Sequence, residues 1–172
     1  QLSFLTALGL HAIGRERMPD ASALQFLLQA DAEWKSLDET WKSKVDNYGL
    51  LQLDICWMYL KLESIEALND TKARLKRAED TLRKQVHVNF VTLALVQADM
   101  GKPVPPMAEI FVRLFLLQGI AAHLEGETEK GQELLAQSAS LLESLRNASP
   151  DSSIQQLLEV MDITRSQAIH AL

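Results

Sequence analysis

The fold of this protein is best predicted from the stretch VDNYGLLQLDICWMYLKLESIEALND, residues 45–70. Between Leu50 and Leu62 the residues are apolar almost all round a helix, with Asp54 and Lys61 as interruptions. A helix at a protein surface keeps one polar side, whereas a helix that is apolar all round is buried. The stretch therefore predicts a central helix, and it is too short and too interrupted for a membrane span.

Three residues of this central helix are candidates for the core of the scaffold or for a binding groove. Trp57 and Leu60 continue its apolar surface, and we expect them to contact helix pairs on both sides. Asp54 is a carboxylate in a buried stretch, where charged groups are retained when they are paired. We therefore expect Asp54 to hydrogen-bond to a neighbouring helix. The alternative is that Asp54 lines a groove and contacts a partner protein.

Amphipathic segments on either side of the central helix predict its neighbours. Apolar residues recur at helical spacing in residues 4–14, and Pro19 then marks a turn. The second helix of this pair has an apolar side that we expect to extend to about Trp41. After the central helix, residues 69–70 are expected to cap a charged helix over residues 71–85, which has only a narrow apolar stripe.

The second half of the chain predicts a further helix pair. The β-branched residues of 86–100 suit a strand, but the length of the segment and the lack of a second strand to pair with favour a helix. Residues 101–106 hold three prolines and are predicted to form a loop. Beyond this loop we expect an apolar helix that Gly126 ends, followed by a helix whose inner face consists of leucines and Ser138.

Small residues in this last pair indicate a repeat. Gly119, Gly131 and Ser138 would let two helices approach closely, in a layout that resembles the tetratricopeptide repeat of about 34 residues. The first pair is similar, with Gly9 in its first helix, and the middle pair has Tyr59 where a glycine is expected. Ordinary helical hairpins are the alternative. We predict an all-α protein, a tetratricopeptide-like α/α superhelix of about three helix pairs.

The chain ends with a segment that we expect to begin a second module. NASPDSS, residues 147–153, consists of small, polar and turn-forming residues, as linkers do. We predict a helical domain over 1–147, a linker over 148–153 and a separate module over 154–172.

The sequence of this module, IQQLLEVMDITRSQAIHAL, resembles the first two helices of a ubiquitin-associated domain. The loop Met161-Asp162-Ile163 corresponds to the recognition loop of that domain. The resemblance implies that this loop, with Leu172, binds a ubiquitin-like protein. The alternative is that the loop packs against the preceding helices.

The composition argues against several functional classes. The 172 residues include 17 Lys and Arg against 23 Asp and Glu, which gives a net charge of −6, and the basic residues are scattered. Nucleic acid would be repelled, because phosphate contacts supply most of its non-specific affinity. The single cysteine, Cys56, excludes an internal disulfide and fits a reducing compartment.

No residue cluster in the sequence predicts catalysis. The histidines at positions 11, 87, 123 and 170 lack the spacing of a metal site, and we expect each to be a partly exposed helix residue. Cys56 lies between two apolar residues, which favours a buried side chain over a nucleophile. Asp54 and Glu63 fall on opposite sides of one helix and cannot act as paired carboxylates. We therefore predict no enzyme, no cofactor and no metal.

Nearly the whole chain resembles one family, the Nedd-eight ultimate buster proteins, also called negative regulators of ubiquitin-like proteins. The resemblance rests on ALGLHAIGR, LLQAD, KVDNYGLLQLDICWMYLKLE, LNDTKARLKRAEDTL and VRLFLLQGIAAHLEGETEKGQELLAQSASLLESL. It implies a non-enzymatic adaptor that recruits ubiquitin-like modifiers and their conjugates to the proteasome for degradation and so down-regulates neddylation.

The implied partners are Nedd-eight, the double ubiquitin-like modifier FAT-ten and proteasome subunits, with no nucleic acid, membrane or small-molecule substrate. The implied location is the nucleus and the cytoplasm. The alternative function is a tetratricopeptide-type peptide-binding or co-chaperone module, which would need a Lys/Arg clamp on the first helices of the pairs. Only Arg113 and Lys61 are available there, so the adaptor is preferred.

Overall fold

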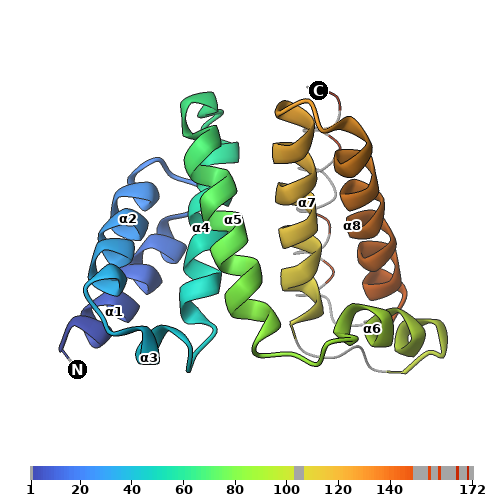
Figure 1. Ribbon diagram of the computed structural model, residues 1–172, viewed down its shortest axis with the longest axis horizontal. Helices are drawn as coiled ribbons and strands as arrows, with labels where there is room; N and C mark the ends of the chain where they lie inside the picture. The colour runs from blue at the N-terminus through green and yellow to red at the C-terminus, as the bar shows by residue number, and fades with distance from the viewer. Residues whose placement is uncertain are drawn as a thin grey trace. The chain divides into compact units, whose positions relative to one another are not determined.

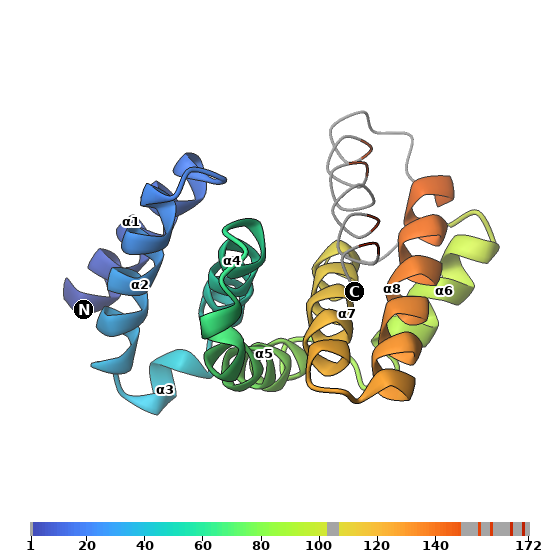
Figure 2. The ribbon, with the colours of Figure 1, turned by 90° about the horizontal axis from the view of Figure 1, so that it is seen from above.

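The computed structural model of the chain describes residues 2–102 and 107–148, together with Gln155, Glu159, Ser166 and His170. Every regular element in this described part is a helix (Figures 1 and 2), so the predicted all-α fold class is confirmed. The chain divides into two compact units, Gln1–His87 and Val88–Leu172, hereafter unit 1 and unit 2.

Unit 1 is built around α4 (Asn47–Lys61), the helix with the largest share of buried residues in this unit. Its elements are α1 (Leu2–Arg17), α2 (Ser22–Lys35), the short α3 (Glu39–Lys42), α4, a 3₁₀ turn (Ile65–Ala67) and α5 (Leu68–Arg83). Helix α1 packs on α2, whereas α4 packs on both α2 and α5 and touches α1. Every residue of α4 from Leu51 to Met58 is buried. The apolar stretch therefore forms a central helix within unit 1.

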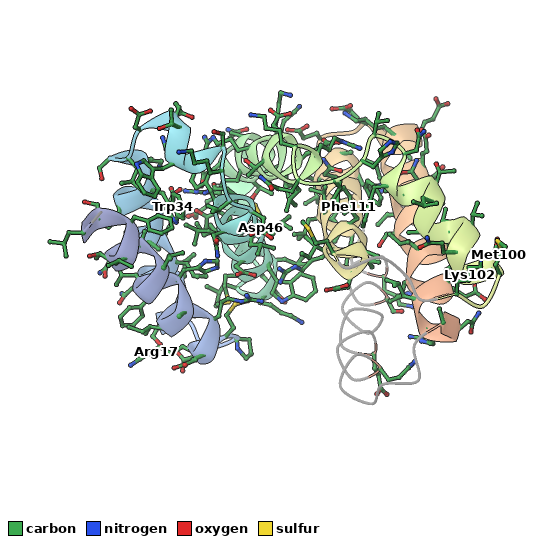
Figure 3. All side chains as sticks on the ribbon, turned by 90° about the horizontal axis from the view of Figure 1, so that it is seen from below. Arg17, Trp34, Asp46, Met100, Lys102 and Phe111 are labelled. Carbon is green, nitrogen blue, oxygen red and sulfur yellow. The ribbon has the colours of Figure 1, made fainter. Side chains whose placement is uncertain are left out.

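Trp34 of α2 is the largest side chain in the fully buried part of this core. Its ring and that of Phe4 in α1 form a T-shaped pair with centroids 5.5 Å apart, and its ring centroid lies 5.6 Å from that of Tyr48 in α4. Figure 3 shows Trp34 on α2 among the side chains of unit 1. One aromatic residue thus joins three helices, and aromatic pairs of this geometry add to the free energy of burial.

The glycine that brings α1 and α2 together is Gly14, and the prediction of Gly9 was wrong. A Cβ at Gly14 would lie 2.6 Å from Leu27, while one at Gly9 would meet nothing within 4 Å. Helix α1 faces its neighbours through Ala7, His11 and Gly14. Gly9 lies about 200° round the helix from Ala7 and so points to solvent.

Two other predicted boundaries need correction. Helix α2 ends at Lys35 and not near Trp41, because Asp38 starts the separate helix α3 by accepting a hydrogen bond from the Thr40 N–H at 3.0 Å. Helix α5 begins at Leu68, so Asp70 lies inside its first turn instead of capping it. The carboxylate of Asp70 is thereby free to contact side chains of its own and the preceding helix.

Unit 2 contains α6 (Phe90–Asp99), α7 (Ala108–Leu124) and α8 (Thr128–Ala148). Residues 86–100, for which the sequence also allowed a strand, therefore contain a helix. Helix α6 packs on α8 and α7, and the ring of Phe90 lies 5.2 Å from that of Phe111 in α7, which Figure 3 labels. Among the described residues, the core of this unit comes mainly from α7, which is buried on most sides.

Helices α7 and α8 approach each other at the small residues that the sequence indicated. A Cβ added to Gly119 would lie 2.8 Å from Leu135, and one added to Gly131 would lie 3.0 Å from the Gly119 carbonyl oxygen. Ser138 is fully buried and donates a hydrogen bond to the Val112 carbonyl at 2.9 Å. Larger side chains at these positions would force the helices apart.

The predicted linker and second module fall almost entirely outside the described residues. Helix α8 continues to Ala148, and Gln155 donates a hydrogen bond from Nε2 to the Arg146 carbonyl at 2.9 Å. The boundaries 1–147, 148–153 and 154–172 stay predictions.

Candidate interaction site

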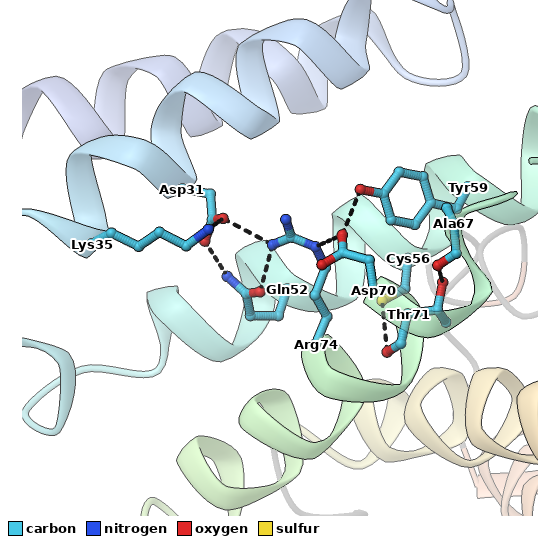
Figure 4. A network of polar contacts seen from close by, with 9 residues as sticks. All are labelled: Asp31, Lys35, Gln52, Cys56, Tyr59, Ala67, Asp70, Thr71 and Arg74. Carbon is cyan, nitrogen blue, oxygen red and sulfur yellow. Dashed lines mark hydrogen bonds and ion pairs between the residues drawn. The ribbon is translucent and has the colours of Figure 1, made fainter.

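A chain of buried polar side chains crosses unit 1 and links three helices (Figure 4). Arg74 of α5 donates from Nη1 to Asp31 of α2 at 2.9 Å and to Gln52 of α4 at 2.8 Å. Gln52 donates in turn to the second oxygen of Asp31 at 2.8 Å. All three residues are at most 4% exposed. Each is therefore removed from water but hydrogen-bonded, as buried polar groups require.

The chain of contacts continues on the other side of the guanidinium. Arg74 Nε donates to Asp70 at 2.6 Å, and the Tyr59 hydroxyl donates to the same carboxylate oxygen at 2.8 Å. At the far end, Lys35 Nζ lies 2.9 Å from Asp31. We call the residues Asp31, Lys35, Gln52, Tyr59, Asp70 and Arg74 the polar network.

The electrostatics of the polar network keep its groups in fixed charge states. Burial alone would raise the pKa of Asp31, but hydrogen bonds from Lys35 and Gln52 and the charge of Arg74 outweigh it and hold this pKa low. Burial would likewise lower the pKa of Arg74, yet the neighbouring carboxylates raise it. Burial and the hydrogen bond to Asp70 raise the pKa of Tyr59 to about 12. At neutral pH the network is therefore a set of ion pairs beside a neutral tyrosine.

A second buried pair ties α1 to α4. His11 Nε2 lies 2.7 Å from Asp54 Oδ2, and both side chains are at most 5% exposed. Arg15 Nε lies 3.4 Å from the same carboxylate oxygen. The contact of Asp54 with a neighbouring helix agrees with the first of the two interpretations given for it. His11 was expected to be partly exposed, and that expectation was wrong, because α1 turns this residue toward α4.

The other two candidates on α4 differ in their surroundings. Trp57 is 7% exposed, and Lys61 Nζ lies 5.4 Å from the centre of its ring, a distance typical of a cation–π contact. Leu60 is half-buried. Asp54 and Trp57 are thus part of the core of unit 1, and a role of these residues in a groove stays a prediction.

The predicted contacts with a ubiquitin-like protein cannot be placed on the structure. Met161, Asp162, Ile163 and Leu172 all lie outside the described residues. Of the two residues considered for a Lys/Arg clamp, Lys61 lies at the end of α4 beside Trp57, and Arg113 is half-buried in α7 of unit 2.

Sequence reasoning missed the polar network although a signal was present. Gln52 lies, like Asp54, inside a largely apolar stretch, and Arg74 adjoins the apolar stripe of α5. A polar side chain in such a position must have a partner, since burial without one costs about 1–3 kcal/mol. The identity of the partner could not be predicted, because Asp31 lies 43 residues from Arg74 in the chain.

The structure also bears on the residues considered for catalysis or metal binding. Cys56 is buried and its Sγ lies 3.8 Å from the Thr71 carbonyl oxygen, in the weak hydrogen bond of a structural thiol. Among the described residues, no group of three or more His, Cys, Asp or Glu side chains could hold a metal ion. Within the same residues, no helix is both long and apolar enough to cross a membrane.

Two curated proteins are similar to this chain, and both are called NEDD8 ultimate buster 1. The chain is 35% identical to the protein of Mus musculus over 149 residues and 32% identical to that of Homo sapiens over 146 residues. Each match covers 83% of this chain and 23% of the relative, so the chain spans about a quarter of the length of the relatives it matches. No protein-family model and no solved structure matches the chain.

Proposed function

We propose a function from the premise that the chain belongs to the NEDD8 ultimate buster family, as the resemblance in its sequence predicts and both relatives confirm. The chain is the helical scaffold of a NEDD8-related regulator. It acts as a non-enzymatic adaptor that brings NEDD8, related modifiers and their conjugates to the proteasome, and it lowers neddylation in the nucleus and the cytoplasm. The observation that carries this proposal is the match over 83% of the chain.

The polar network supports a scaffold over an enzyme. The carboxylates of Asp31 and Asp70 are both bound to Arg74, and Asp54 is bound to His11. A general base needs an accessible atom and a pKa near the working pH, whereas the pKa of Tyr59 is raised to about 12. These groups stabilise the contact between helices, which an adaptor needs in order to hold its binding modules at fixed positions.

In this proposal residues 154–172, called the tail from here on, make the contact with the modifier. Met161 and Ile163 give an apolar loop that would meet the apolar surface of a ubiquitin-like protein, and Leu172 extends it. Asp162 stands where such loops commonly have glycine, and its side chain and charge reduce the closeness of approach. We therefore expect weak binding by the tail, which suits a carrier that must release its cargo.

A titration followed by nuclear magnetic resonance tests the recognition step. Isotope-labelled chain is titrated with NEDD8 and, separately, with ubiquitin, and the expected shifts occur at residues 161–163. Ile163→Asp should abolish them, whereas Val88→Asp, the same kind of change at a residue that is 84% exposed in unit 2, should not. Unchanged resonances at residues 161–163 with both partners would remove the recognition role of the tail.

The adaptor step needs its own measurement. Immobilised chain is incubated with purified proteasome in the presence and absence of NEDD8, and an adaptor holds both proteins at once. If NEDD8 displaces the proteasome, the two partners compete for one site and the chain does not link them.

A further inference from the structure

The strongest unassigned feature of unit 1 is a pocket of about 360 Å³ at the junction of α3 and α5. We call it the α3–α5 pocket. Both helices are labelled in Figure 2. Its walls come from the end of α2, from α3, from the start of α4 and from the C-terminal half of α5. The lining residues are Lys35, Glu39, Lys42, Ser43, Tyr48, Arg77, Asp80, Thr81 and Lys84.

The charges around this pocket leave a positive surplus. Four of the nine lining residues are cationic and two are carboxylates. Within the lining, Lys42 binds Glu39 at 2.8 Å. Lys35 and Asp80 pair with groups outside the lining, Lys35 with Asp31 at 2.9 Å and Asp80 with Lys76 at 3.5 Å. Arg77 and Lys84 supply the surplus, although the chain as a whole carries a net charge of −6.

Arg77 has a donor that the described part of the chain does not satisfy. Its Nη1 atom is buried and has no hydrogen-bond partner among the described residues. A buried donor without an acceptor costs about 1–3 kcal/mol, and more when the group is charged. Arg77 as a whole is half-buried, so a rotation of its guanidinium would bring this donor to an anionic ligand in the pocket and recover that cost.

The remaining lining groups fit a peptide better than a polyphosphate. Ser43 and Thr81 already donate their hydroxyl protons to main-chain carbonyls at 3.2 and 2.8 Å, so their oxygens are left to accept peptide N–H groups. The carboxylates of Glu39 and Asp80 can accept N–H groups too, and a peptide backbone supplies such donors whereas a nucleic-acid backbone does not.

We propose that the α3–α5 pocket binds an acidic segment of a partner protein, with Arg77 and Lys84 holding carboxylate side chains of that segment. Charge-assisted hydrogen bonds from Arg77 to a carboxylate are the main source of affinity. The site lies within unit 1 and does not depend on the tail or on the proposed function. Unit 1 therefore carries a binding surface of its own.

Fluorescence anisotropy with labelled hexaglutamate tests this proposal on the 172-residue chain. We expect saturable binding at low salt, loss of binding as salt screens the charges, and no binding of labelled hexaglutamine. Resonance shifts should fall at residues 35–48 and 77–84. Absence of saturable binding, or shifts confined to other residues, would overturn the proposal.

Two double variants of α5 separate the pocket from general charge. Arg77→Gln with Lys84→Gln should weaken hexaglutamate binding about tenfold or more. Lys72→Gln with Arg83→Gln removes the same charge from residues of α5 that do not line the pocket, and it should change affinity less than about twofold. Equal weakening by both pairs would mean that only the net charge matters. Thermal melts establish that each variant is folded, and Lys84→Gln alone gives a milder test.

The last binding measurement uses a labelled hexathymidine oligonucleotide. It carries comparable negative charge but no peptide N–H groups, so we expect it to bind more weakly than hexaglutamate. Tighter binding of the oligonucleotide, lost in the variant of Arg77 and Lys84, would overturn the assignment to an acidic peptide.

Discussion

Units 1 and 2 hold their helices together by different means. Among the described residues, unit 1 buries five polar or charged side chains, namely His11, Asp31, Gln52, Asp54 and Arg74. The described part of unit 2 buries only Ser138 of this kind and relies on the close approach of two glycines. Unit 1 therefore depends on the pairing of buried charges in addition to a close helix contact at Gly14, whereas the described part of unit 2 depends mainly on shape. Substitutions that leave one unit unaffected should be costly in the other.

The largest effect is expected when Arg74 is replaced by Met. This change removes the donors from Asp31, Gln52 and Asp70 and leaves a buried carboxylate without its guanidinium, which costs about 3–5 kcal/mol of unfolding free energy. Urea unfolding at neutral pH measures it.

The matched control for this prediction lies on the same helix. Arg83 pairs with Glu79 at 2.7 Å, but its side chain is half exposed. Arg83→Met should therefore cost no more than about 0.5 kcal/mol. A similar small value for Arg74→Met would show that the polar network does not stabilise unit 1.

In unit 2 the corresponding test is Gly119→Ala. The new Cβ would lie 2.8 Å from Leu135 Cγ and 3.1 Å from the Gly131 carbonyl oxygen, so α7 and α8 must separate. We expect a loss of about 1–3 kcal/mol in a thermal or urea melt. Gly9→Ala is the control, because its Cβ meets nothing within 4 Å, and it should stabilise the chain by about 0.5–1 kcal/mol. If Gly119→Ala and Gly9→Ala changed the stability in the same direction, the close approach of α7 and α8 would be refuted.

The sequence predicted the parts of this comparison that depend on one helix at a time. The apolar run of α4 correctly indicated its central position within unit 1, and Gly119 and Gly131 correctly indicated a tight pair. The choice of Gly9 over Gly14 failed, since either residue satisfies a helical pattern and only the orientation of α1 distinguishes them. Pairs such as Arg74 with Asp31 depend on how three helices are aligned, which spacing in the sequence does not determine.

A smaller effect is expected for Ser138→Ala. The hydroxyl of Ser138 donates to the Val112 carbonyl at 2.9 Å in the buried contact of α7 and α8, and loss of this bond should cost about 1 kcal/mol. Ser140 on the same helix is exposed, so Ser140→Ala should change stability by less than about 0.5 kcal/mol. Urea unfolding of both variants decides whether unit 2 needs the buried hydrogen bond of Ser138.

The smallest expected difference between the two units is their response to low pH. The folded state lowers the pKa of Asp31 and Asp70 below the ordinary value of 3.8, so both stabilise unit 1 at neutral pH. This stabilisation is complete above 3.8 and is lost as the pH falls through the lower folded values. Amide hydrogen exchange should therefore show protection falling in α4 and α5 below about pH 4 before it falls in α7 and α8. Simultaneous loss in both units would contradict the contrast drawn here.

The polar network also has a consequence for the order in which unit 1 assembles. Its bonds join residues 21, 22 and 43 positions apart in the chain, so they close only after α2, α4 and α5 have met. Bringing such distant segments together costs chain entropy before any bond repays it. The bonds should therefore form after the rate-limiting step of folding, and their loss should speed unfolding while leaving the folding rate nearly unchanged. The network then sets how long the folded scaffold persists, which is a kinetic property that its equilibrium stability alone does not reveal.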